Sequence, residues 1–189
     1  MQLTEILSKY YGIRITPDLE DVISRIFRTE QLKKKTTLFM NGDSNPRHYF
    51  VGEGLLRLYI IDSSGKEFNL LFAYESQVIG DLAAPAPTQF NLDTIEDSLV
   101  YSIDEAGLRE LTGLMTDSDR GGADLIRRSY LFLQKRLVSI LSKTAEENYL
   151  ELIDKNPALL QRLPQYHVAS YLGVSPEFLS KIIARTIKQ

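Results

Sequence analysis

The feature that most constrains the fold is a change in residue pattern along the chain. From about residue 33 to 102, short runs rich in Val, Ile, Leu, Phe and Tyr are separated by the turn signals "NGD", "GEG" and "SSG". Two of these runs, "LLRLYII" and "FNLLFAY", flank "DSSGKE", a spacing that predicts a β-hairpin. Repeated short strands of this kind favour a sandwich or barrel. The stretch from Gly80 to Asn91 contains "AAPAP" and is expected to interrupt the sheet.

The segments on either side have the periodicity of helices. Before the strands, Thr16 and Pro17 are suited to begin a helix. Its apolar residues follow the spacing of one buried face and are Leu19, Val22, Ile23, Ile26 and Phe27. After the strands, "DEAGLRELTGLM" predicts a short helix, and a longer helical pattern runs from about Asp119 to Ser142. A further helix is expected to end near Lys155, because Pro157 disfavours helical geometry at the residue before it.

Composition excludes several classes of site. The chain has no Cys, which removes disulfides, thiolate metal sites and Cys nucleophiles. Its only two His, His48 and His167, lie far apart in sequence and cannot by themselves supply a multi-His metal site. The N-terminus does not read as a signal peptide, and no apolar run approaches the ~20 residues that span a bilayer. The expected compartment is the cytoplasm, with no membrane partner.

The charge of the chain is uneven. The net charge is −3 and the pI about 5.5, which is not typical of a nonspecific nucleic-acid binder. Residues 156–189, however, contain four basic residues and only one acidic residue, Glu177. A small basic unit on an acidic body fits local contact with DNA, although a patch of this size also arises readily by chance.

The long helical pattern contains a heptad-like seam. Its members step by four and three residues over about two heptads, and they are Ile126, Tyr130, Leu133, Leu137 and Ile140. A second apolar set, Leu125, Phe132 and Leu141, lies off the seam. We expect one side of the helix to pack on the β domain and the seam to meet the same helix of a second subunit. A helix buried entirely within one subunit is the alternative that the spacing leaves open.

Residues 168–185, "VASYLGVSPEFLSKIIAR", predict two helices joined by a tight turn. Gly173 fits a turn with positive φ, Ser175 fits the N-cap of the second helix, and Pro176 fits its first position. The expected buried stripe of this helix is Phe178, Leu179, Ile182 and Ile183. The residues expected on its outer face are Glu177, Ser180, Lys181, Ala184 and Arg185. This pattern suits a DNA-reading helix-turn-helix, but an ordinary helical hairpin shares much of it.

The order of these parts resembles the Crp/Fnr family of bacterial transcription regulators. The resemblance covers nearly the whole chain and is carried by "FVGEGLLRLYIIDSSGKEFNLLFAYESQVIGDL" and "LPQYHVASYLGVSPEFLSKI". It implies an α+β fold in three parts. Residues 1–117 would form a cyclic-nucleotide-binding-like β-roll (a double-stranded β-helix) with flanking helices, residues 118–142 a dimerisation helix, and residues 143–189 an all-α helix-turn-helix domain. Many family members continue into a β-wing, and no wing is expected here.

The resemblance also implies which residues contact double-stranded DNA. At the start of the second helix these are Ser175, Pro176, Glu177, Phe178, Ser180 and Lys181. Glu177 is suited to accept from a cytosine amine and Lys181 to donate to guanine. Gln165, Ser175 and Arg185 are better suited to phosphates. Members that respond to cyclic AMP often have Arg where Pro176 stands, so their target sequence is not transferred. A solvated helix face is the alternative for each polar residue.

The family's effector segment falls on Gly80–Thr94. The pocket residues implied there are Gly80, Asp81, Leu82, Thr88 and Gln89. Cyclic-nucleotide binders use a Glu for the ribose and an Arg for the phosphate. Asp81 stands in the acidic position, but residues 80–96 contain no Lys or Arg. The missing charge-assisted pair is worth about 1.5–3 kcal/mol, so we predict that cyclic AMP does not bind. The effector is expected to be another small molecule or none, with no cofactor.

Three functions are compared. The leading one is a homodimeric regulator in which a signal at the roll biases the pairing of the long helices, with RNA polymerase as a further candidate partner. The second is a sensing or interaction module that keeps the fold and binds no DNA. The third is an enzyme on a cupin-like roll, which would need several His for a metal. His48 is the only His in the roll and is expected at the surface or a strand end, so neither a catalytic nor a metal site is predicted.

Overall fold

The computed structural model describes residues 1–12, 14–44, 46–81, 87–114 and 121–186, and it leaves aside the side chains of residues 121–126. The chain divides into two compact units, one of residues 1–60 and 70–128 and the other of residues 61–69 and 129–189. No helix among the described residues is both long and apolar enough to cross a membrane. The division at residues 117 and 142 expected from the sequence stays a prediction.

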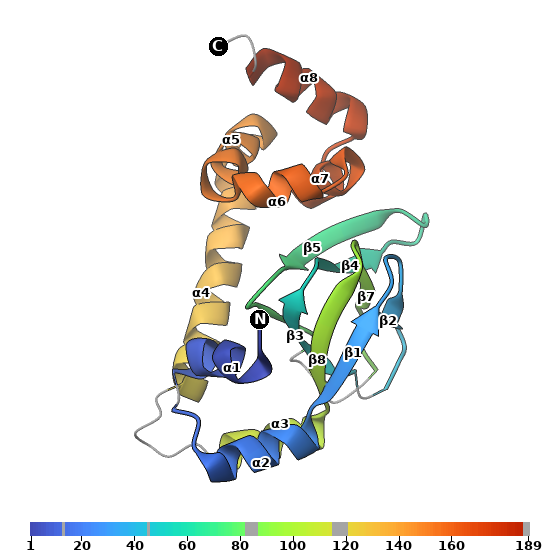
Figure 1. Cartoon of the computed structure of the whole chain (residues 1–189). Helices are drawn as coiled ribbons and strands as arrows, with labels where there is room; N and C mark the ends of the chain where they lie inside the picture. The colour runs from blue at the N-terminus through green and yellow to red at the C-terminus, as the bar shows by residue number, and fades with distance from the viewer. Residues whose placement is uncertain (13, 45, 82–86, 115–120, 187–189) are drawn as a thin grey trace. The chain divides into compact units, whose positions relative to one another are not determined.

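The first unit is built around two four-stranded sheets with antiparallel pairing (Figure 1). The strands are β1 (Arg28–Leu32), β2 (Thr37–Phe39), β3 (His48–Glu53), β4 (Leu56–Ile61), β5 (Glu67–Ala73), β6 (Val78–Ile79), β7 (Asn91–Thr94) and β8 (Ser98–Ile103). One sheet has the order β1-β8-β3-β6 and the other β2-β7-β4-β5. Because most partners are distant in sequence, the chain rolls up into two layers. The predicted β-roll and the β4–β5 hairpin are confirmed.

An apolar core fills the space between the two sheets. Its buried residues are Phe39, Tyr49, Val51, Leu56, Leu58, Ala73, Ile79, Leu92 and Val100. In β4, Leu56 and Leu58 belong to this core, so the alternation of a strand places Arg57 and Tyr59 on the opposite face of their sheet. The polar residues of β4 therefore do not interrupt the packing between the sheets.

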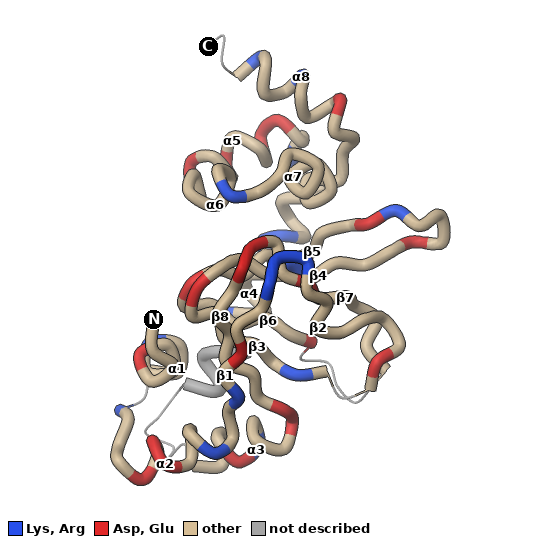
Figure 2. Tube along the Cα trace, turned by 45° about the vertical axis from the view of Figure 1, so that its right-hand side comes forward, with Lys and Arg blue, Asp and Glu red and all other residues tan. Residues whose placement is uncertain are grey.

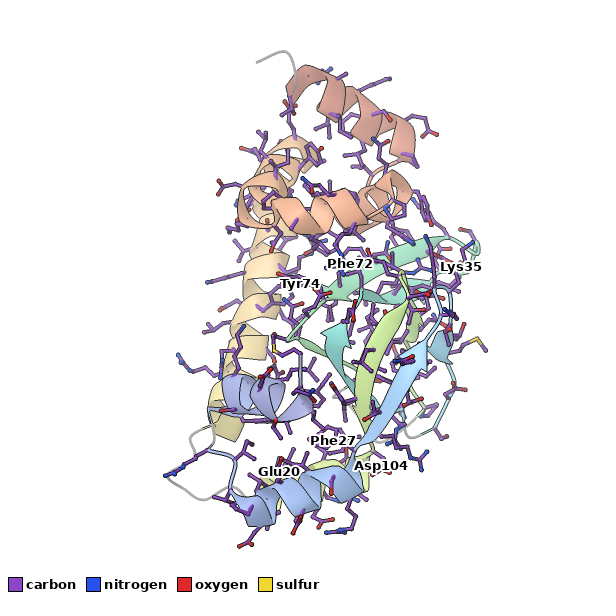
Figure 3. The ribbon with its side chains drawn as sticks, in the orientation of Figure 1. Glu20, Phe27, Lys35, Phe72, Tyr74 and Asp104 are labelled. Atoms are coloured by element: carbon purple, nitrogen blue, oxygen red, sulfur yellow. The ribbon has the colours of Figure 1, made fainter. Side chains whose placement is uncertain are left out.

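Three helices cover the outer face of the β1-β8-β3-β6 sheet: α1 (Leu3–Tyr11), α2 (Pro17–Ile26) and α3 (Glu105–Gly113). Thr16 caps α2 by accepting from the Leu19 N–H at 3.4 Å, as its sequence predicts. Asp104 caps α3 by accepting from the Gly107 N–H at 2.9 Å. Phe27 and Asp104 lie where these helices join the sheet (Figure 3). The pattern of the sequence did not predict α1, although two of its residues, Ile6 and Leu7, are fully buried.

The second unit is helical. It contains most of α4 (Gly121–Ser142), followed by α5 (Ala145–Lys155), α6 (Pro157–Arg162), α7 (Gln165–Leu172) and α8 (Pro176–Thr186). Thr144 and Glu147 form a reciprocal capping box at the start of α5, and α5 ends at Lys155 as expected. α7 and α8 pack against each other through buried residues that include Val168, Ala169 and Leu179.

Candidate DNA interface and effector segment

The turn between α7 and α8 has the geometry that its residues predict. Gly173 adopts a φ of 73°, in the left-handed region that glycine enters without a Cβ penalty. α8 then begins at Pro176. The Ser175 hydroxyl caps it by accepting from the Phe178 N–H at 3.2 Å. The predicted turn, cap and helix start are therefore confirmed.

The residues predicted to contact DNA all lie on exposed surface. They are Gln165, Ser175, Pro176, Glu177, Phe178, Ser180, Lys181 and Arg185. By contrast, Leu179 and Ile182 are 0% and 1% exposed. The prediction that Phe178 shares their buried stripe is wrong, because its side chain is 47% exposed. Position 178 is rotated by about 100° from position 179 around the helix axis, which turns it away from α7.

The acidic and basic residues of α8 lie in different turns of the helix. Its first turn carries Glu177 and its later turns carry Lys181 and Arg185 (Figure 2). The pKa of Glu177 is lowered, first by its own backbone N–H and then by the Ser175 hydroxyl. The Arg185 guanidinium lies 3.9 Å from the Glu146 carboxylate of α5. The acidic group is thus held at the positive end of the helix, and the basic groups remain on exposed surface.

A contact between residues 61–69 and α7 within the second unit has no signal in the sequence. The Asn69 amide donates to the His167 carbonyl at 3.0 Å and lies 3.2 Å from His167 Nδ1. The Ser170 hydroxyl accepts from the Asn69 N–H at 2.9 Å and donates to the Glu67 carbonyl at 2.7 Å. Asn69 and His167 are 3% and 6% exposed. These partners are about a hundred positions apart, so no local pattern links them.

The seam of α4 is exposed along its described length. Tyr130, Leu133, Leu137 and Ile140 are 63%, 57%, 57% and 56% exposed, and the side chain of Ile126 lies outside the described residues. Of the off-seam residues, Phe132 and Leu141 are 47% and 76% exposed, and the expectation that one side of the helix packs on the β domain stays a prediction. The side chain of Leu125 is not described. So much exposed apolar surface on one helix is unusual for a monomer and is typical of an interface.

The structure brings together only part of the predicted effector pocket. Asp81 and Thr88 are buried, and the Thr88 hydroxyl donates to the Asp81 carboxylate at 2.7 Å. The Thr88 hydroxyl also accepts from the Phe90 N–H at 3.2 Å. Gln89 is exposed, and Leu82 lies outside the described residues. Two of the side chains predicted to line the effector pocket are therefore bonded to each other.

His48 lies beside this segment and is not a surface residue. It stands at the start of β3, as expected, but is 3% exposed. A Cβ on Gly80 would lie 2.8 Å from His48 Nδ1, so this close approach requires glycine. Nδ1 has no hydrogen-bond partner among the described residues, and Nε2 lies 3.8 Å from the Glu105 carboxylate. Burial lowers the pKa of His48, while Glu105 and then Asp81 oppose that shift.

Arg57, a cation that the sequence analysis did not consider, lies in the second sheet. Arg57 on β4 pairs with Asp93 on β7 through Nε–Oδ1 and Nη2–Oδ2 contacts, each of 2.8 Å. The two side chains are 8% and 15% exposed. The guanidinium also lies 3.9 Å from the centre of the Tyr59 ring. A carboxylate from the effector region thus already holds this arginine.

The described residues contain no group of three or more side chains suited to hold a metal ion. The two His lie in different units, and the charged groups that act on the pKa of His48 are the carboxylates of Glu105 and Asp81.

Comparison with known proteins finds similarity to transcription regulators. The model of the cyclic nucleotide-binding domain matches residues 29–113. Over 180 residues the chain is 25% identical to the transcriptional activator protein FnrA of Stutzerimonas stutzeri, in an alignment that covers 88% of this chain and 72% of that protein. The chain thus resembles the Crp/Fnr family of regulators and contains a segment similar to a cyclic nucleotide-binding domain.

Solved structures of regulators share the fold of this chain. FixK2 from Bradyrhizobium japonicum has a TM-score of 0.75 at 18% identity, covering 87% of this chain and 86% of that one. The c-di-GMP responsive global regulator CLP of Xanthomonas campestris has a TM-score of 0.70 at 16% identity, covering 92% of each chain. At these identities the likeness concerns the fold, and the predicted fold class is confirmed.

Proposed function

We propose that this protein is a homodimeric transcription regulator that reads double-stranded DNA with α8. The observation that carries the proposal is the first half of α8, which is set by the Gly173 turn and the Ser175 cap and presents an exposed Lys181. A second helix held in this way can enter a major groove with its N-terminal residues at the base edges. The similarity to the transcriptional activator FnrA supports this function.

Dimerisation is proposed to occur through the exposed apolar residues of α4. Burying the side chains of Leu133, Leu137 and Ile140 against a second copy would remove them from water, which stabilises the association. Two copies of α8 related by a two-fold axis would then meet successive major grooves, about 34 Å apart. A signal at the roll would act by changing how the two α4 helices pair, and an activator of this kind would also contact RNA polymerase.

We test DNA binding by measuring affinity for duplex fragments over a range of salt concentrations. Lys181→Met should weaken binding and reduce the slope of log K against log salt by about 1 if Lys181 neutralises a phosphate. If Lys181 reads a base instead, affinity falls and the slope is unchanged. Lys34→Met, which removes an exposed lysine of the first unit, is the matched control and should alter neither quantity.

The second candidate function is a sensing or interaction module that binds no DNA. The observation that favours it is the net charge of −3, which opposes association with a polyanion. Absence of binding at low salt, where attraction to phosphate is strongest, would support this second function and contradict the first.

We also propose that cyclic AMP is not the effector. The Asp81 carboxylate and the Thr88 hydroxyl are bonded to each other, and Arg57 is held by Asp93. A cyclic phosphate would have to break one of these contacts before it gained a partner. Calorimetry should therefore show no heat of binding with cyclic AMP or cyclic GMP. Micromolar binding with a matching rise in Tm would overturn this proposal.

A further inference from the structure

Phe178 is an exposed aromatic residue in the first turn of α8. It is 47% exposed, while the next residue, Leu179, is fully buried against α7. Lys181 and Arg185 follow at three and seven positions, so they lie on the same side of the helix as Phe178. The outer face of α8 therefore combines one large apolar group with two cations.

The polar groups of this first turn are already engaged within the helix end. The Ser175 hydroxyl accepts from the Phe178 N–H and bonds to Glu177. The Ser180 hydroxyl donates to the Pro176 carbonyl at 3.0 Å. Proline has no N–H to offer a base. The first turn thus presents little that donates a hydrogen bond, and the Phe178 ring is its most prominent outward group.

We propose that Phe178 recognises the 5-methyl group of a thymine in the major groove. This inference rests on the DNA binding proposed above and names the base that the helix selects. The thymine methyl is the apolar group on the major-groove edge of the base pairs, and phenylalanine is among the side chains that contact it. Cytosine, adenine and guanine present polar atoms there, so they leave the ring without an apolar partner.

The surroundings of Phe178 fit nucleic acid better than an apolar protein surface. The flanking residues Glu177, Ser180 and Lys181 are polar and exposed, so the ring does not belong to a contiguous apolar patch. Lys181 and Arg185, which both follow Phe178 on the same side of α8, would face phosphates or base edges next to the contacted thymine. The ring and its neighbouring cations thus match a methyl group beside phosphates.

The experiment starts with selection of bound duplexes from a random pool by the full-length protein. Thymines in the selected site are then replaced one at a time by deoxyuridine, which removes only the methyl group. At the position that Phe178 contacts, this replacement should weaken wild-type binding about fourfold per half-site, the effect of losing one buried methyl. The Phe178→Ala variant should bind the thymine and uracil duplexes equally.

The control is Leu150→Ala, which truncates a 41% exposed apolar residue of α5 in the same unit. This variant should keep the wild-type preference for thymine. Circular dichroism and Tm should be unchanged in both variants, because neither side chain is buried. If no sequence is enriched and no duplex binds at low salt, the proposed function itself fails. If a site is selected but Phe178→Ala keeps the wild-type loss at every uracil, the inference about Phe178 is overturned.

Discussion

In the effector segment of the roll, Asp81 and Thr88 are buried and bonded to each other, whereas in α8 Phe178 and Lys181 are exposed. Both segments contain residues that the sequence predicts to meet a ligand. In the first, the polar groups have become part of the interior. In the second, the side chains of the outer face are left for a partner. The two regions therefore differ in what a substitution should change.

Substitutions in the roll should alter stability and leave DNA affinity of the folded protein unchanged. Substitutions of the exposed side chains of α4 or α8 should alter association and leave the stability of the isolated chain unchanged, because those side chains contact water there. A single variant that affects both quantities strongly would break this comparison.

The largest effect on stability is expected from Arg57→Met. Loss of the guanidinium leaves the Asp93 carboxylate, 15% exposed, without its bidentate partner. Removing one member of a buried ion pair destabilises a protein by about 3–5 kcal/mol. Urea unfolding measures the change. Lys33→Met is the control, because its pair with Asp97 has side chains 87% and 62% exposed and should change the unfolding free energy far less. Equal effects of the two variants would show that the Arg57 pair does not behave as a buried one.

The next largest effect is expected from Leu137→Glu on α4. A carboxylate in the seam should prevent dimerisation, and a monomer loses the gain from binding two half-sites together. DNA affinity should then fall at least about 100-fold. Analytical ultracentrifugation and fluorescence anisotropy measure the two changes. Leu141→Glu alters a residue that is 76% exposed but off the seam, and it should remain dimeric. If both variants dissociate, or neither does, the prediction that the dimer forms through the seam of α4 is wrong.

Features that depend on neighbours in the chain could be predicted from the sequence. The Thr16 and Ser175 caps, the Gly173 turn and the β4–β5 hairpin each follow from the local chemistry of their residues. The fold class was reached from the order of these parts. The same local patterns predicted the exposure of the polar residues of α8, because helical periodicity separates an inner face from an outer one.

Features that depend on distant partners could not be predicted. Arg57 finds Asp93 across two strands that are 36 positions apart, and the sequence alone showed only an effector segment without a cation. His48 was expected near the surface, but the packing of α3 and of Gly80 around β3 buries it. For Phe178 the apolar residue type suggested burial, and only its angular position on α8 shows that it faces outward.

A smaller loss of stability is expected from Thr88→Val, which keeps the shape of the side chain. The variant removes the hydrogen bond to the Asp81 carboxylate and the one accepted from the Phe90 N–H. We expect a loss of about 2 kcal/mol in unfolding free energy, with DNA affinity unchanged. Thr37→Val on β2 changes an exposed threonine and should stay within about 0.5 kcal/mol of the wild type. A stable Thr88→Val protein that gains affinity for a cyclic nucleotide would show that this hydrogen bond closes a functional pocket.

The smallest effect is expected from protonation of His48. Burial lowers its pKa below the ordinary value of 6.5, so the folded state binds this proton less readily than the unfolded state. The stability that neutral His48 supports is fully present above that value and is lost as the pH falls through the lowered pKa. The stability difference between the wild type and His48→Gln, measured by urea unfolding, should therefore shrink between about pH 7 and about pH 5. A difference that grows on acidification would mean that protonated His48 gains the Glu105 carboxylate, 3.8 Å away, as a partner. In that case His48 would stabilise the roll more at low pH than at high pH, which is opposite to the effect of burial alone.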